Sequence, residues 1–312
     1  PEHNRDGFRA TIAIHFSDAG HFLRASDIIS TLPDLGAFPD VLSHLCSSLA
    51  RSGRMHDAER EFNRIKSDYW QLTTRLDLIK YAHPELPTAK TISHLEDIEK
   101  RAGGLSGKTQ KAKLHLKIGH SWMAIDEGPR ASESVTRGVT AVTELPATRR
   151  RTDILTKLAS LSVQLGDYNG AIAIAGNQID PSRRAEALKH ISVTMRDLGA
   201  DDRAKSTLEL AFQEARSLPD SQIRQSLVAT IIRLQCQLGD YDKAIDFTED
   251  ISPASHKALA WFEIALCLAT TGPATEDAGE PYALDMTRPL KASFTAEEDL
   301  LVARLLDRMR EK

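Results

Sequence analysis

Apolar residues recur along this chain at intervals of three and four residues, the spacing that places them on one side of an α-helix. The clearest stretch is residues 152–165, whose leucines share one face: Leu155, Leu158, Leu161 and Leu165. Gly166 ends this pattern, because glycine adopts the left-handed conformation that closes a helix without a steric penalty. A second apolar pattern then runs until Pro181, which cannot continue a helix. The stretch predicts two helices joined by a short turn.

The same unit recurs along the chain. Six glycines each close an apolar stretch of this kind: Gly20, Gly53, Gly166, Gly199, Gly239 and Gly272. Three intervals between neighbours are 33 residues (20–53, 166–199 and 239–272), and one is 40 residues (199–239). A period in this range is typical of stacked helical hairpins, each of which buries its apolar face against its neighbours. We therefore expect an all-α repeat fold.

Two further units lack the glycine. The first consists of a helix over 68–81, a proline-containing connection at 83–87 and a helix over 88–102. The second consists of a helix over 109–124, a turn at 126–129 and a helix over 130–144. With these two units the count is about eight antiparallel helical hairpins.

The order of residues within a unit resembles the tetratricopeptide repeat (TPR) family. The best matches are Gln-Leu-Gly-Asp-Tyr-Asp-Lys-Ala at 237–244 and Gln-Leu-Gly-Asp-Tyr-Asn-Gly-Ala at 164–171. The resemblance covers residues 6–272, although tryptophan fills the family's first position only at Trp261. It implies an α-solenoid wound as a right-handed superhelix, in which the first helix of each hairpin lines the concave groove.

The spacing also predicts second helices of two lengths. Gly199 and Pro219 are 20 residues apart, whereas Gly20 and Pro33 are 13 apart, so the longer helices gain almost two turns. We divide the chain into a TPR-like α-solenoid at 1–272, an irregular proline-containing loop at 273–293 and a C-terminal capping helix at 294–312. That last helix opens with the capping box Thr295-Ala-Glu-Glu298. A partner-binding or dimerising role for it is the alternative.

Composition narrows the possible partners and the compartment. A net charge of −4, with 27% charged residues, gives no overall field that favours nucleic acid or an anionic membrane. The three cysteines lie in apolar helical segments, which suggests reduced core thiols: Cys46, Cys236 and Cys267. No apolar run is long enough to span a bilayer. We expect a cytoplasmic location, and the start at Pro1 suggests a piece of a longer protein.

Residues 102–109 satisfy a relaxed phosphate-loop pattern ending in Gly107-Lys108-Thr109. Such a loop follows a buried strand, but the preceding residues read as helix, so we interpret it as a connection between hairpins. The sequence shows no metal-ligand spacing and no catalytic constellation. We expect no catalytic residues, no cofactor and no enzymatic activity.

The candidate site is therefore the concave groove. The family's register places the following residues of the first helices there, all of them polar except Phe262: Ser43, His44 and Ser47; Lys113, Lys117 and His120; Asp153, Thr156, Lys157 and Ser160; Glu186, Lys189 and His190; Arg233; Phe262 and Glu263. The basic and hydroxyl-bearing members predict a protein or peptide partner, an acidic one being favoured. Asparagines that complete a carboxylate clamp in one member of the family are absent. The plain alternative is a solvated polar helix face.

Two function classes remain open. The first is a non-catalytic interaction scaffold that binds a peptide or partner segment in the groove. The second is a TPR-like sensor or docking domain excised from a larger multidomain regulator or secreted effector. RNA binding by a helical-hairpin array is disfavoured by the irregular intervals and the negative net charge. Arg149, Arg150 and Arg151 at a predicted helix start are read as surface residues, or as a site for an anion.

Overall fold

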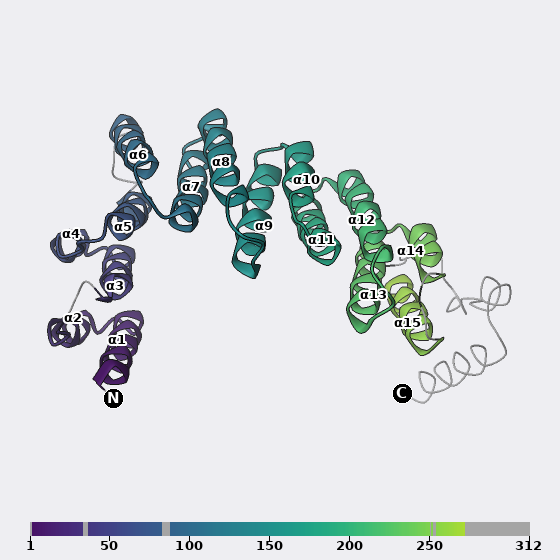
Figure 1. Cartoon of the computed structure of the whole chain (residues 1–312), viewed down its shortest axis with the longest axis horizontal. Helices are drawn as coiled ribbons and strands as arrows, with labels where there is room; N and C mark the ends of the chain where they lie inside the picture. The colour runs from purple at the N-terminus through teal and green to yellow at the C-terminus, as the bar shows by residue number, and fades with distance from the viewer. Residues whose placement is uncertain (1, 34–36, 83–87, 250, 252–253, 272–312) are drawn as a thin grey trace, which may run out of the picture. The chain divides into compact units, whose positions relative to one another are not determined.

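The computed structural model describes residues 2–33, 37–82, 88–249, 251 and 254–271. Within these residues it contains 15 α-helices and no strand (Figure 1), which confirms the all-α prediction there. The chain forms two compact units, Pro1–Asp167 and Tyr168–Lys312. The predicted loop at 273–293 and capping helix at 294–312 lie outside the described residues, so that division of the chain stays a prediction.

The first unit is a row of helical hairpins. Its helices are α1 (Glu2–Asp18), α2 (Phe22–Ser30), α3 (Pro39–Arg51), α4 (Met55–Phe62), α5 (Asp68–Ala82), α6 (Thr88–Gly103), α7 (Lys108–Met123), α8 (Gly128–Thr143) and α9 (Arg149–Gln164). Each odd-numbered helix up to α7 packs against the helix that follows it. The odd-numbered helices also contact one another in order, from α1 to α9. The first helices of the hairpins therefore form one continuous layer.

The second unit repeats this arrangement. Its helices are α10 (Tyr168–Gly176), α11 (Pro181–Asp197), α12 (Asp201–Arg216), α13 (Gln222–Gln237), α14 (Tyr241–Thr248) and α15 (Ala254–Thr271). Helices α11 and α12 form one hairpin and α13 and α14 another, while α11, α13 and α15 contact in order. Six hairpins thus lie wholly within one unit or the other. The architecture is that of a TPR-like α-solenoid repeat, as the sequence predicts.

Five of the six predicted glycine turns have the geometry that the pattern requires. The φ angles of Gly20, Gly53, Gly166, Gly199 and Gly239 lie between 73° and 80°. In each turn the next residue's N–H donates to a carbonyl five residues earlier, as His21 does to Phe16 at 2.8 Å. This is the Schellman motif, which satisfies carbonyls at the end of a helix. Gly272 lies outside the described residues.

A sixth turn has the same geometry without a glycine. Asp126 has a φ of 62°, and the N–H of Glu127 donates to the carbonyl of Trp122 at 3.0 Å. Asp126 lies 40 residues before Gly166, so it occupies the position of the missing cap glycine. Aspartate tolerates the left-handed conformation better than most residues. The fourth hairpin therefore follows the repeat, and Gly128 instead begins the next helix.

The second helices have two lengths, as predicted. Helices α2, α4, α10 and α14 have 8 or 9 residues, whereas α6, α8 and α12 each have 16. The difference is close to two helical turns. Because the added turns extend the helix rather than shift it, the buried stripe keeps its phase.

Close packing between helices depends on small residues at two positions of α7 and α8. A Cβ atom on Gly119 would lie 2.8 Å from Leu161 Cδ2, and one on Gly138 would lie 2.9 Å from Leu158 Cδ2. Both leucines are fully buried, as is Trp122. Burial of each such leucine contributes about 1.5–3 kcal/mol. The contacts fix α7, α8 and α9 as one packed group.

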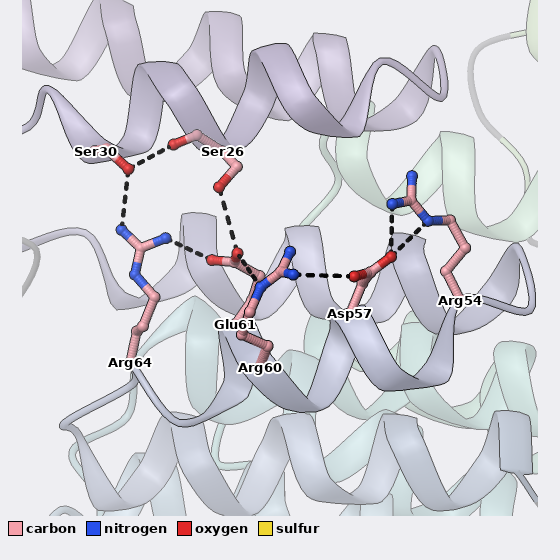
Figure 2. A network of polar contacts seen from close by, with 7 residues as sticks. All are labelled: Ser26, Ser30, Arg54, Asp57, Arg60, Glu61 and Arg64. Carbon is pink, nitrogen blue, oxygen red and sulfur yellow. Dashed lines mark hydrogen bonds and ion pairs between the residues drawn. The ribbon is translucent and has the colours of Figure 1, made fainter.

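A polar network joins α2 and α4, the second helices of the first two hairpins (Figure 2). Glu61 on α4 is only 3% exposed, and it accepts hydrogen bonds from Ser26 of α2 at 3.3 Å and from Arg64. Arg64 also donates to Ser30 of α2 at 3.4 Å. A buried carboxylate is tolerated only when it is paired and hydrogen-bonded. The network therefore connects the first two hairpins through their second helices.

Candidate functional site

Polar side chains connect successive first helices of the first unit. His44 Nε2 lies 2.8 Å from Asp18 Oδ1, which joins α3 to α1. Ser47 Oγ donates to Asp77 Oδ2 at 3.0 Å, and Lys117 Nζ donates to Asp77 Oδ1 at 3.1 Å. Asp77 of α5 is therefore shared between α3 and α7. We call these five residues the polar ladder.

Three of these residues belong to the predicted groove register, and two do not. His44, Ser47 and Lys117 were predicted, and the structure brings each against a neighbouring first helix. The aspartates at positions 18 and 77 were missed. Asp77 belongs to the hairpin of α5 and α6, to which the sequence analysis assigned no groove residues. It lies 33 residues after His44 and 40 before Lys117, so either repeat length would have identified it.

A cavity of about 500 Å³ opens beside the polar ladder, between α5, α6 and α7. Its apolar wall consists of Leu76, Ile79, Ala124 and Ile125. Its polar lining consists of Asp77, Lys80, Thr91, Lys117, His120 and Ser121. Two predicted groove residues, Lys117 and His120, therefore lie in its wall.

The charges around the cavity are only partly compensated. Lys117 shares the carboxylate of Asp77, whereas Lys80 makes no ion pair within the described residues and lies 5.8 Å from the ring centre of Tyr81. Loss of contact with water lowers the pKa of His120, and the charge of Lys80 lowers it further. A neutral His120 leaves Lys80 as the main uncompensated charge at the rim.

Other predicted residues of the first unit lie on α7 and α9. Lys113 is exposed on α7, one helical turn before Lys117. On α9, Lys157 is exposed, while Thr156 donates to the carbonyl of Thr152 at 3.0 Å and Ser160 is half-buried. None of these residues joins the polar ladder through a hydrogen bond within the described residues.

In the second unit the predicted residues form a local cluster on α11. Lys189 Nζ lies 2.7 Å from Glu186 Oε1, and His190 Nε2 lies 3.6 Å from the same oxygen. Hydrogen bonding by His190 and then by Lys189 lowers the pKa of Glu186 to about 2. Arg233 is exposed on α13. The two units are described separately, so a single groove that contains all these residues stays a prediction.

The phosphate-loop pattern lies in a short connection between helices. The connection covers residues 104–107, follows helix α6 rather than a strand, and ends where Lys108 begins α7. Lys108 Nζ pairs with Glu144 Oε2 at 2.8 Å, beyond the end of α8. This arrangement agrees with the interpretation of an inter-hairpin loop. Arg151, the last of the three consecutive arginines at 149–151, also has a partner nearby in the chain, because its guanidinium donates to the carbonyl of Leu145 at 3.0 Å.

The chemistry of the other candidate residues is also clear in the described part of the chain. Cys46, Cys236 and Cys267 are buried thiols that form no disulfide, and burial raises the pKa of Cys46 to about 12. In the described ranges, no group of three or more His, Cys, Asp or Glu side chains could hold a metal ion. None of the described helices is both long and apolar enough to traverse a bilayer.

No family model matches the chain, and no curated protein matches it. Among solved structures, it is similar to apo RapI, with 11% identity, a TM-score of 0.41 and coverage of 85% of this chain and 86% of the other. BtubC from P. vanneervenii has 17% identity, a TM-score of 0.37 and coverage of 74% and 90%. A tetratricopeptide repeat protein from Parabacteroides merdae has 14% identity, a TM-score of 0.35 and coverage of 84% and 98%. These identities and TM-scores are too low to support an argument about this chain. The description of the chain as a TPR-like repeat therefore rests on its own helix pairing and turns.

Proposed function

We propose that this chain is a non-catalytic protein–protein interaction scaffold that binds a peptide or partner segment along its first helices. The observation that supports this function is the polar ladder. It arranges polar side chains from α1, α3, α5 and α7 in succession, and it lies beside an open cavity. A row of this kind suits an extended segment that crosses several helices, because each helix offers a contact to a successive part of the segment.

The charges favour an acidic segment. Lys113 and Lys117 are four residues apart on α7, so their ammonium groups lie on one face of that helix. Lys117 is partly neutralised by Asp77, whereas Lys113 is exposed and makes no ion pair in the described part of the chain. Lysine side chains attract carboxylates and hydrogen-bond to them. Buried cysteines that form no disulfide agree with the reducing cytoplasm that we expect for this binding.

The experiment is a selection of 12-residue peptides from a random display library on the immobilised full chain. We expect the selected peptides to be enriched in Asp and Glu, and to lose binding on the double variant Lys113→Glu with Lys117→Glu. The matched control is Lys100→Glu, which reverses the charge of an exposed lysine on the second helix α6. Circular dichroism checks that each variant is folded. Peptides whose binding is equal on all three proteins would rule out this face.

A further inference from the structure

We propose that the cavity between α5, α6 and α7 is a binding pocket for a small organic carboxylate with an apolar aromatic or aliphatic body. This site goes beyond the interaction scaffold, since its ligand is a free small molecule rather than a partner segment. It lies wholly within the first unit.

The size and the lining of the cavity fit a small molecule. Its volume of about 500 Å³ lies within the range of about 300–1,000 Å³ that is usual for ligand pockets. Its apolar wall, Leu76, Ile79, Ala124 and Ile125, would remove a hydrocarbon body from water. An extended peptide on the polar ladder would touch mainly the rim of this volume, so we assign the interior to a separate, compact ligand.

A buried hydroxyl in the cavity wall points to a polar group on that ligand. Thr91 is 1% exposed and lines the cavity from α6. Its Oγ1 atom has no hydrogen-bond partner in the described structure. Buried hydroxyls nearly always have a partner, because leaving one without a partner is costly in proteins. Oγ1 itself is shielded in this structure, so a ligand oxygen that enters the cavity would satisfy Thr91 once rotation about χ1 turns the hydroxyl towards it.

The rim indicates that the ligand carries a negative charge. Asp77 is already compensated by Lys117 and by the hydroxyl of Ser47. Lys80 is exposed at the rim and makes no ion pair within the residues described. A carboxylate near Lys80 gains a charge-assisted hydrogen bond, whereas an ammonium in the same place would be repelled. The apolar wall, Thr91 and Lys80 together thus favour an apolar carboxylate over an amine of the same shape.

The test uses three probes with one apolar body and different charge: 4-phenylbutyrate, 4-phenyl-1-butanol and 4-phenylbutylamine. Each is titrated into the full chain, and binding is followed by protein-observed methyl NMR. We expect the carboxylate to bind most tightly, about fivefold or more tighter than the amine, with the alcohol between them. Shifts should concentrate on the methyl groups of Leu76, Ile79, Thr91 and Ile125. Equal affinities for the three probes, shifts elsewhere, or no binding up to the solubility limit of the probes would overturn the proposal.

Three variants separate the contributions of Lys80, Thr91 and the open volume of the cavity to ligand binding. Lys80→Gln should remove the preference for the carboxylate and leave the affinity for the alcohol unchanged. Thr91→Val, which keeps the shape of the side chain, should weaken the binding of 4-phenylbutyrate severalfold. Ala124→Phe places a ring at an exposed position of the cavity wall, so it should abolish binding without disturbing the core. The control Lys100→Gln should bind like the unmodified chain.

The two proposals fail independently. Lys113 is not part of the cavity wall, so Lys113→Glu should leave binding of 4-phenylbutyrate within twofold of its original value. If Thr91→Val does not fold, Ala124→Phe still decides the case, because its side chain is at the surface. Retention of phenylbutyrate binding by Ala124→Phe would place the ligand outside this cavity and would overturn the inference.

Discussion

Lys117 Nζ lies 3.1 Å from Asp77 Oδ1, so one ion pair joins α7 to α5 at the point where the polar ladder meets the cavity. Both side chains are partly exposed, at 43% and 27%. Pairs of this kind are worth little in water, because solvent screens the attraction and the two side chains lose conformational freedom. The pair therefore orients charge more than it holds the two helices together.

This relationship gives the first prediction. A double-mutant cycle with Asp77→Asn and Lys117→Gln should yield a coupling free energy of about 0.5–1 kcal/mol, measured by urea unfolding. Asp77→Asn alone should tighten the binding of acidic peptides, because it frees the charge of Lys117. A coupling near zero, together with unchanged peptide affinity, would show that the pair does not tune the charge of this face.

The second prediction concerns the cap at Asp126. A non-glycine residue at a φ of 62° carries a conformational cost that glycine avoids. Asp126→Gly should therefore stabilise the chain by about 0.5–1 kcal/mol in urea unfolding.

The reverse change at a glycine turn of the same type provides the control. Gly199 has a φ of 76°, and a Cβ atom there would meet no other atom within 4 Å. Gly199→Ala should destabilise the chain by about 1 kcal/mol, and the cost is conformational because space is available. A loss of stability in Asp126→Gly would mean that the aspartate side chain stabilises the turn by another route.

The third prediction concerns His115, which is buried on α7. Burial, and to a smaller extent the positive charges of Arg137 and Lys111, lower its pKa from 6.5 to about 4. The folded state thus prefers the neutral ring, while the unfolded state takes up a proton near pH 6.5. The stabilising effect is full above pH 6.5 and is lost as the pH falls towards 4. Between pH 7 and pH 4 the loss is on the order of 3 kcal/mol.

The measurement is the free energy of unfolding at pH 7, 5.5 and 4, with His115→Leu for comparison. The leucine variant should lose less stability than the unmodified chain across this range. His190, exposed on α11, provides the matched control, since His190→Leu should leave the decrease from pH 5.5 to pH 4 largely intact. Parallel curves for the unmodified chain and His115→Leu would contradict the prediction.

The sequence predicted the fold well because the repeat depends on local rules. Apolar spacing, a left-handed turn at residues such as Gly166 and a stop at Pro181 are each encoded within a few residues. The turn at 126–129 was predicted, but Asp126 was not identified as its left-handed cap because only glycine was read as a cap, although aspartate also reaches this conformation.

The site was predicted less completely, because it depends on pairs of residues rather than on single positions. The register placed Lys117 on the first-helix face, but no register was assigned to the hairpin of its partner Asp77. The cavity requires the packing of three helices, and Thr91 of α6 belongs to a second helix, outside the groove register. The spacing of residues along the sequence therefore does not predict the cavity that remains between these three helices.

The fourth prediction concerns the network that joins α2 to α4 (Figure 2). Glu61 is 3% exposed and accepts hydrogen bonds from Ser26 and Arg64. The side chain of Glu61 is 4% exposed and forms ion pairs with Arg60 and Arg64. Glu61→Gln keeps the size of this side chain but removes its negative charge. A buried group that loses a charged partner costs about 1–3 kcal/mol, so Glu61→Gln should destabilise the chain by that amount.

Ser26→Ala should cost about 1 kcal/mol. Because the two residues are in contact, their double variant should lose less than the two single variants together. Asp57→Asn is the control, because Asp57 is partly exposed and pairs with Arg54 and Arg60 rather than with α2, so it should lower the urea midpoint less than Glu61→Gln does. Hydrogen exchange should report faster opening of α2 in Glu61→Gln but not in Asp57→Asn, since only Glu61 contacts α2. Strictly additive losses for Glu61→Gln and Ser26→Ala would show that α2 and α4 are held by apolar packing alone.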